Sequence, residues 1–242
     1  MKTQFILLAI LTLFTSACSD AWEGCTRAKG KWQSEYFPLQ SFEKVSMYDR
    51  IDLHLVQSDS TGLKIEYFEN DLESIQWDSL VGELSIKHFK TCEWAKTYEA
   101  PKVTLYFNNL STISQFGSGI ITNEGNLQLT KLHLEVKNAS GNLTLRGDFG
   151  TLTITSNGIS NITLQGTASE FRPGYYFNDG RLYASDLVAE KVFVRHRGYN
   201  DLYIHASSEL TGFIENTGNV YYQGNPSLLS VEETWEGKLI RQ

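Results

Sequence analysis

Apolar and polar residues alternate in short runs along most of the chain, and in its second half these runs recur at a fixed interval. The first apolar residue of successive runs falls at Leu143, Ile162, Leu182, Leu202 and Val220, at intervals of 18 to 20 residues. Alternation with a period of two is typical of strands with one buried face. A fixed interval near 20 is typical of stacked repeats. The pattern predicts an all-β fold: a β-helix-like solenoid with coils of about 20 residues.

A second set of apolar runs falls between the members of the first. Its members start at Leu132, Leu152, Val192 and Leu210, with Phe171 as a weaker copy. Each coil is therefore expected to hold two strands, and each apolar stripe would be buried against the next coil. Leucine-rich repeats have a similar period, but their Leu-x-x-Leu-x-Leu frame is missing here.

The residues just before each run of the first set are typical of tight turns. One column reads Asn142, Asn161, Arg181, Asp201 and Asn219, and the column before it reads Gly141, Ser160, Gly180, Asn200 and Gly218. Gly, Asn and Asp tolerate left-handed backbone angles, which we expect these corners to require. Stacked Asn side chains can also hydrogen-bond along the axis.

The chain divides into parts of different regularity. We expect an irregular β region over 36–115, regular coils over 116–225 and a C-terminal cap over 226–242, together one domain over 36–242. The irregular part would serve as an N-terminal β cap, because an open strand edge at the end of a solenoid promotes aggregation.

The first residues resemble a bacterial lipoprotein leader. Lys2 is followed by an apolar run of about ten residues, shorter than the roughly 20 that span a bilayer. Small residues then precede Cys18. We expect a signal peptide over 1–17, lipidation of Cys18, and a tether over 18–35. Ser19 and the acids that follow resemble sorting to the outer membrane, so the expected location is the cell envelope.

Cys25 and Cys92 remain once Cys18 is assigned to the lipid. An even pair in an oxidising compartment predicts a disulfide, with two free thiols as the alternative. The net charge of −7 becomes −8 when the leader and its Lys2 are removed, which argues against nucleic acid as a partner.

Several segments resemble a known family in their order. They are Phe42-Glu-Lys-Val45, Ile51-Asp-Leu-His-Leu-Val-Gln57, Phe116-Gly-Ser-Gly119-Ile120 and Gly218-Asn-Val-Tyr-Tyr-Gln-Gly-Asn-Pro226. Together they are similar to the auto-transporter adhesin head GIN domain family, which consists mostly of envelope proteins of Bacteroidetes. The resemblance implies a β-helical fold, a location in the envelope and adhesion. It supplies no catalytic site.

Catalytic chemistry has weak support in the sequence. The aspartates fall at different coil positions, the five histidines lack metal-ligand spacing, and no nucleophile or phosphate motif is present. We therefore expect no metal and no cofactor. The densest polar stretch, Arg195 to Asp201, could hold an anionic sugar but is expected to be a solvated corner.

The aligned coils place one aromatic stripe on the outside. It consists of Tyr183, Tyr203 and Tyr221, and the next outward row reads Arg146, Gln165, Ser185, His205 and Gln223. A flat tyrosine platform with His205 beside it would suit a glycan or a partner protein. The alternative is that the rings only stabilise the sheet.

Three functions follow from these features. The first is a lipid-anchored, non-catalytic adhesion or surface-interaction module whose partners are the membrane, through its lipid, and a glycan or an envelope protein. The second is a β-helical enzyme acting on polysaccharide. The third is a structural component of the envelope.

Overall fold

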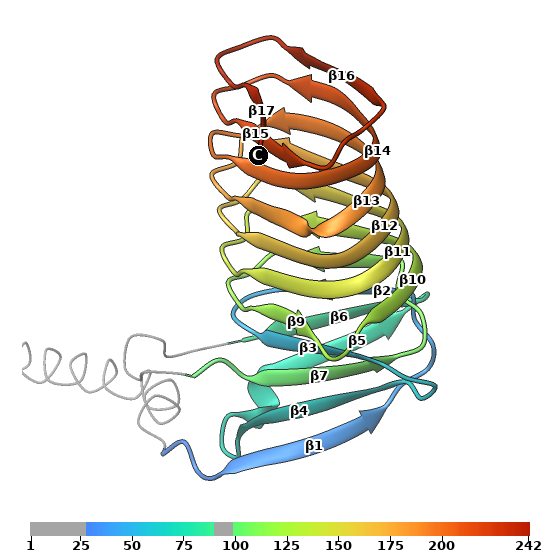
Figure 1. Ribbon diagram of the computed structural model, residues 1–242. Coiled ribbons are helices and arrows are strands. Elements are labelled where there is room, and N and C mark those ends of the chain that lie inside the picture. The colour runs from blue at the N-terminus through green and yellow to red at the C-terminus, as the bar shows by residue number, and fades with distance from the viewer. Residues whose placement is uncertain (1–27, 90–98) are drawn as a thin grey trace, which may run out of the picture.

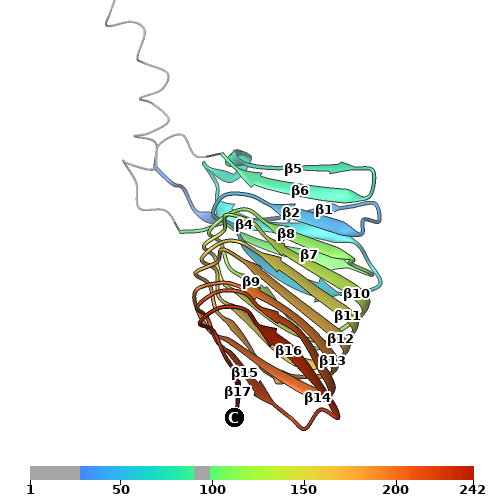
Figure 2. The same cartoon turned by 90° about the horizontal axis from the view of Figure 1, so that it is seen from above.

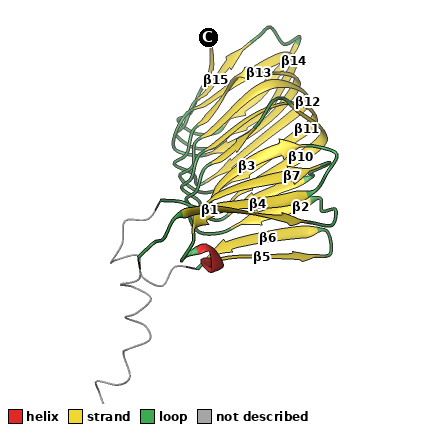
Figure 3. Cartoon of the chain, turned by 90° about the horizontal axis from the view of Figure 1, so that it is seen from below, coloured by secondary structure: helices red, strands yellow, loops and turns green. Residues whose placement is uncertain are grey.

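The computed structural model describes residues 28–89 and 99–242, which form one continuous β-structure. The strands are β1 (Trp32–Pro38), β2 (Lys44–Met47), β3 (Asp52–Gln57), β4 (Gly62–Phe68), β5 (Ile75–Leu80), β6 (Glu83–His88), β7 (Lys102–Phe107), β8 (Thr112–Gln115), β9 (Ile121–Asn123), β10 (Leu127–Val136), β11 (Leu143–Ser156), β12 (Ile162–Tyr176), β13 (Leu182–Arg197), β14 (Leu202–Ile214), β15 (Val220–Gln223), β16 (Leu228–Glu233) and β17 (Leu239–Arg241). One short 3-10 helix, η1 (Leu72–Ser74), precedes β5, and it is the red turn in Figure 3. The all-β prediction is confirmed.

Each regular coil is a single long strand that bends, followed by a tight turn. In β11 the side chains alternate between inside and outside up to Phe149, then two residues in a row, Gly150 and Thr151, lie toward the outside before alternation resumes at Leu152. This change of phase divides the strand into two arms. We call the arm before the bend face A and the arm after it face B. The turn after Ser156 returns the chain to face A at the next level of the stack, and we call each such level a rung.

Successive coils stack in parallel with the predicted register. Leu143 pairs with Ile162, Ile162 with Leu182, Leu182 with Leu202, and Leu202 with Val220. All five side chains are buried in one core that both faces share. The solenoid with coils of about 20 residues is therefore confirmed. Figure 1 shows the long strands nested one above another, with the tight turns gathered on the opposite side.

The turn glycines are required for a reason other than the one expected. None of Gly141, Gly180 and Gly218 is among the residues with positive φ. Instead, a Cβ at Gly141 would overlap the carbonyl oxygen of Gly119, and a Cβ at Gly180 would overlap that of Ser160. The expectation of left-handed angles was wrong at these glycines. The turns lie so close together along the axis that a side chain would strike the backbone of the preceding rung.

The column after the glycines forms a ladder of side chain to backbone hydrogen bonds. Oδ1 of Asn142 accepts from the backbone N–H of Asn161 at 3.0 Å, and Oδ1 of Asn161 accepts from Arg181 at 3.0 Å. Asp201 and Asn219 accept in the same way from the rung that follows each. The polar column therefore holds successive turns in register, at about 1 kcal/mol for a typical bond.

The N-terminal part contains rungs whose order in space differs from their order in the chain. On face B, Val45 of β2 pairs with both Leu84 of β6 and Ile113 of β8, in parallel. On face A, Leu53 of β3 pairs with Val103 of β7 and Ile121 of β9. The rung β2–β3 is thus inserted between β6–β7 and β8–β9.

The two ends of the stack differ. At the N-terminal end β4 pairs with β7 and β5 pairs with β6, both in antiparallel fashion, and β1 pairs with β4 as the outermost strand of face A. At the other end β16 and β17 continue the two faces in parallel. Figure 2 shows β5 at one end of the molecule and β16 and β17 at the other.

Candidate functional site

The tyrosine stripe lies on the outside of face A, on three consecutive rungs. Tyr183 pairs with Tyr203, and Tyr203 pairs with Tyr221. On the N-terminal side the same column continues as Thr163, Thr144 and Thr122. Because every coil contributes one residue to this column, three threonines are followed by three tyrosines along it.

The tyrosine rings stack on one another and do not lie flat on the surface. The ring centroids of Tyr183 and Tyr203 are 5.7 Å apart with planes at 8°, and those of Tyr203 and Tyr221 are 5.1 Å apart at 12°. Neighbouring rings therefore cover each other's faces in an offset stack, and the surface presents mainly their edges. Tyr203, in the middle, has a pKa raised by burial first and then by the charge of Asp201.

The row beside the tyrosines departs from the expected alignment. The register of β13 shifts after Ala184, so Gln165 of β12 pairs with Asp186, and His205 of β14 pairs with Val188. Ser185 therefore does not occupy the place between Gln165 and His205 that the repeat assigned to it. The pairing of β14 with β15 is regular, and His205 pairs with Gln223 as expected. Asp186, an exposed carboxylate beside the stripe, was not foreseen because the coils were aligned on the first apolar residue of each, and the shift falls after that residue.

Face B carries the stretch that was expected to be a solvated corner. Arg195 and Arg197 do lie outward, and both donate to Glu215, at 3.2 Å from Nε of Arg195 and at 2.8 Å from Nη2 of Arg197. These bonds, that of Arg197 foremost, lower the pKa of the Glu215 carboxyl. His196 between them points into the core and is fully buried. The expectation was wrong for this histidine, since alternation along β13 directs it inward.

The acidic side chains do not converge on a catalytic arrangement in the part of the chain that is described. Residues 28–89 and 99–242 contain no group of three His, Cys, Asp or Glu side chains suited to a metal ion. Asp148 accepts hydrogen bonds from Asn126, Gln128 and Thr167, and these bonds, led by that from Gln128, lower its pKa. Its oxygens therefore take part in structural hydrogen bonds at a corner.

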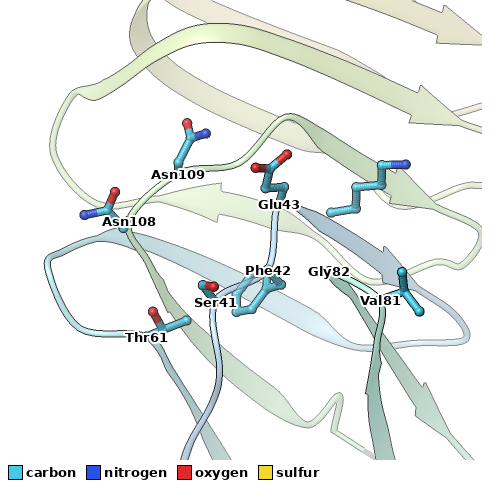
Figure 4. Close-up of a pocket in the computed structure, with 9 residues that line it drawn as sticks. Ser41, Phe42, Glu43, Thr61, Val81, Gly82, Asn108 and Asn109 are labelled. Atoms are coloured by element: carbon cyan, nitrogen blue, oxygen red, sulfur yellow. The ribbon is translucent and has the colours of Figure 1, made fainter.

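One cleft of about 400 Å³ lies where the chain crosses between N-terminal rungs. Figure 4 shows Thr61 and Asn108 on one side, Val81 on the other, and Glu43 above Phe42. The backbone carbonyl of Glu43 accepts from the N–H of Ser111 and that of Thr112. The cleft thus accompanies the crossover that seats β2 beside β8, and its lining brings no set of acidic or nucleophilic groups together.

The predicted lipidation site, Cys18, lies outside the described residues. The same holds for Cys25 and Cys92, so their disulfide stays a prediction. In the described segments no helix is long and apolar enough to cross a membrane.

Comparison with known protein families matches residues 41–226 to the family described as "Putative auto-transporter adhesin, head GIN domain". This match covers most of the chain, including all the regular coils. The chain belongs to the head GIN domain family. The resemblance of the N-terminal and C-terminal segments to this family is confirmed, and the family's description implies a protein of the cell surface or envelope.

Solved structures of similar fold come from species of Bacteroides and Parabacteroides. A protein of Bacteroides fragilis described as "a putative adhesin" is 22% identical, with a TM-score of 0.80 over 88% of this chain and 97% of the other. A protein of Parabacteroides distasonis described as "Putative lipid binding protein" is 18% identical, with a TM-score of 0.61 over 87% of this chain and 97% of the other. A protein of Parabacteroides merdae described as "a putative adhesin" is 19% identical, with a TM-score of 0.61 over 88% of this chain and 97% of the other.

These similarities establish the fold of this head GIN domain. The names of the three proteins refer to adhesion or lipid binding and none of them to an enzyme. No curated protein sequence matches the chain.

Proposed function

We propose that this head GIN domain is a non-catalytic adhesion module of the cell envelope, anchored by a lipid on Cys18, that binds a glycan or an envelope protein through face A. The observation that carries the proposal is the tyrosine column on a rigid sheet. Tyr183 is 42% exposed, and polar side chains flank the column on both sides. Aromatic rings with polar neighbours on a fixed scaffold are typical of recognition surfaces.

The rigidity of the scaffold supports recognition on face A. The backbone under Tyr183, Tyr203 and Tyr221 is paired on both sides, and the inward neighbours of the three tyrosines are buried. A ligand that contacts these side chains would therefore meet groups whose ordering is already complete, which lowers the entropic cost of binding. The alternative function, a structural component of the envelope, has the mutual stacking of the rings in its favour.

Replacing the central tyrosine separates the two functions. Tyr203→Ala removes both stacking contacts. We expect binding to arrayed glycans or to immobilised outer-membrane preparations to fall at least tenfold. The melting temperature should fall by only a few degrees, because cross-strand pairs contribute roughly 0.2–1 kcal/mol each.

Phe193→Ala is the matched control for Tyr203→Ala. Phe193 is 41% exposed on face B, where its ring packs edge-on against Phe213. Its loss should leave capture unchanged. If the two variants bind alike, or if Tyr203→Ala unfolds while the wild type captures nothing, the column is a structural element.

The anchor is tested by Cys18→Ala. The thiol is the only group at that position that can carry the acyl chains, so the variant should move from the membrane fraction to the soluble fraction of the cell. Cys25→Ala is the control and should stay with the membrane. Continued membrane association of Cys18→Ala would count against lipidation.

A further inference from the structure

The tyrosine column ends abruptly at Tyr183. The next residue in the file is Thr163, which is paired directly with Tyr183 but is too short to cover a phenol ring. One face of the Tyr183 ring stacks on Tyr203, while the other points along the file toward Thr163. The exposed fraction of 42% makes Tyr183 an exposed side chain, whereas Tyr203 and Tyr221 are half-buried. The stack therefore has a vacant place for one more ring above Thr163 and Thr144.

The irregularity in β13 places a carboxylate at the border of this place. Because the register shifts after Ala184, Asp186 lies beside Gln165 in the row next to the file, and its side chain is exposed. Irregular pairings of this kind redirect side chains and are frequent next to binding sites. The neighbouring rung adds Arg146, which is paired with Gln165 and also exposed.

The groups around the vacant place match the chemistry of a sugar. An aromatic face packs against the C–H groups of a pyranose ring, and the hydroxyl groups at the ring's edge need both donors and acceptors. Asp186 is an acceptor, Arg146 is a donor, and the amide of Gln165 is both. Thr163 and Thr144 add hydroxyl groups beneath the ring.

We infer that face A binds one terminal pyranose ring of a glycan, which takes the vacant place in the stack against Tyr183 with Arg146, Gln165 and Asp186 at its edge. This inference rests on the proposed adhesive function and specifies its ligand. The ring plane of Tyr183 is nearly parallel to that of Tyr203, which lies one rung further along, so the stack runs along the solenoid axis. A sugar in this stack has its plane across the axis.

This orientation of the sugar ring favours a sugar at the end of a glycan over one in its interior. In an extended polysaccharide the chain continues roughly within the plane of each ring. Because Gln165 and Asp186 border the place at its side, the two neighbours of an internal ring stacked on Tyr183 would leave from opposite edges, one toward solvent and one toward the sheet. A neighbour on the inner side would run into the sheet that carries Thr163 and Gln165. A terminal ring has a single neighbour, which can leave toward solvent.

Two variants test the vacant place, one by removing the ring that borders it and one by filling it. Tyr183→Ala removes the stacking surface. Thr163→Tyr fills the place with a fourth ring while it keeps Tyr183. The probe is an array of oligosaccharides fixed through their reducing ends, so that each non-reducing terminal ring is free. We expect both variants to lose at least tenfold in affinity for the sugars that the wild type binds, and Thr163→Tyr to melt no lower than the wild type.

Thr153→Tyr on the outside of face B is the control for an added surface tyrosine, and it should bind as the wild type does. Cyclic oligosaccharides, which have no terminal ring, should not compete. The inference is overturned if Thr163→Tyr binds normally, if cyclic sugars compete, or if the wild type binds nothing on the array. If Tyr203→Ala alone loses capture of outer-membrane preparations in that case, the adhesive function stands without this ligand.

Discussion

Gly141→Ala is expected to destabilise the solenoid by about 3 kcal/mol or more, and to lower the melting temperature by about 10 °C. The added Cβ would overlap the carbonyl oxygen of Gly119 on the preceding rung. It would also press on Nε2 of Gln115, which donates to that same carbonyl at 2.6 Å. Because Gln115 is fully buried, losing this bond leaves a polar group without a partner in the core. Thermal unfolding followed by circular dichroism measures the effect.

The control for Gly141→Ala is Gly125→Ala. Gly125 has a φ of +65°, yet nothing lies within 4 Å of the position its Cβ would take. Alanine there meets only the strain of the left-handed region, about 1 kcal/mol. If Gly125→Ala costs as much as Gly141→Ala, the loss at Gly141 does not arise from the close approach between rungs.

The regular half of the fold could be predicted because each coil meets the next one in the chain. Leu143 and Ile162 are neighbours in space and one repeat apart in sequence, so the apolar period shows the contact directly. The same logic placed Phe171 correctly between Leu152 and Val192, although it lacks the usual alternation around it.

The N-terminal rungs could not be predicted in the same way. Val45 lies between Leu84 and Ile113, two residues that are far from it in the sequence and from one another. Here the chain forms one rung first and adds the rungs on both sides of it later. Neighbouring rungs are therefore not separated by a constant number of residues, and the sequence shows no period. Alternation identified these segments as strands, and their parallel partners depend on packing of the whole chain.

The candidate site was predictable in position and less so in geometry. The repeat aligned Tyr183 with Tyr203, but it carries no information on side-chain rotation, and so the stacked rings and the single uncovered face came from the structure. Asp186 was missed because an irregular pairing moves it one place along β13.

Acidification from pH 7 to pH 4 is expected to remove about 3 kcal/mol of stability through His196 alone. Burial lowers the pKa of this imidazole to about 4, against 6.5 for an exposed histidine, while the backbone at Asn200 and the charge of Asp201 oppose that shift weakly. The folded state therefore holds the neutral ring, and the unfolded chain binds the proton first. Stability is complete above pH 6.5 and declines as the pH falls toward 4.

The inner column to which His196 belongs shows how to test this effect. The column passes through Gln115, Val136, Ser156 and Tyr175 before it reaches His196. Since Gln115 is already accommodated there, His196→Gln should fold, and its unfolding free energy in urea should lose about 3 kcal/mol less than that of the wild type between pH 7 and pH 4. His205→Gln, outside on face A, is the control and should keep the wild-type loss. The lowered carboxyl pKa values of Glu135, Glu215 and Glu233 act below 4.5, so they do not account for a decline that begins near pH 6.5. An equal loss in His196→Gln and the wild type would show that another group drives the acid sensitivity.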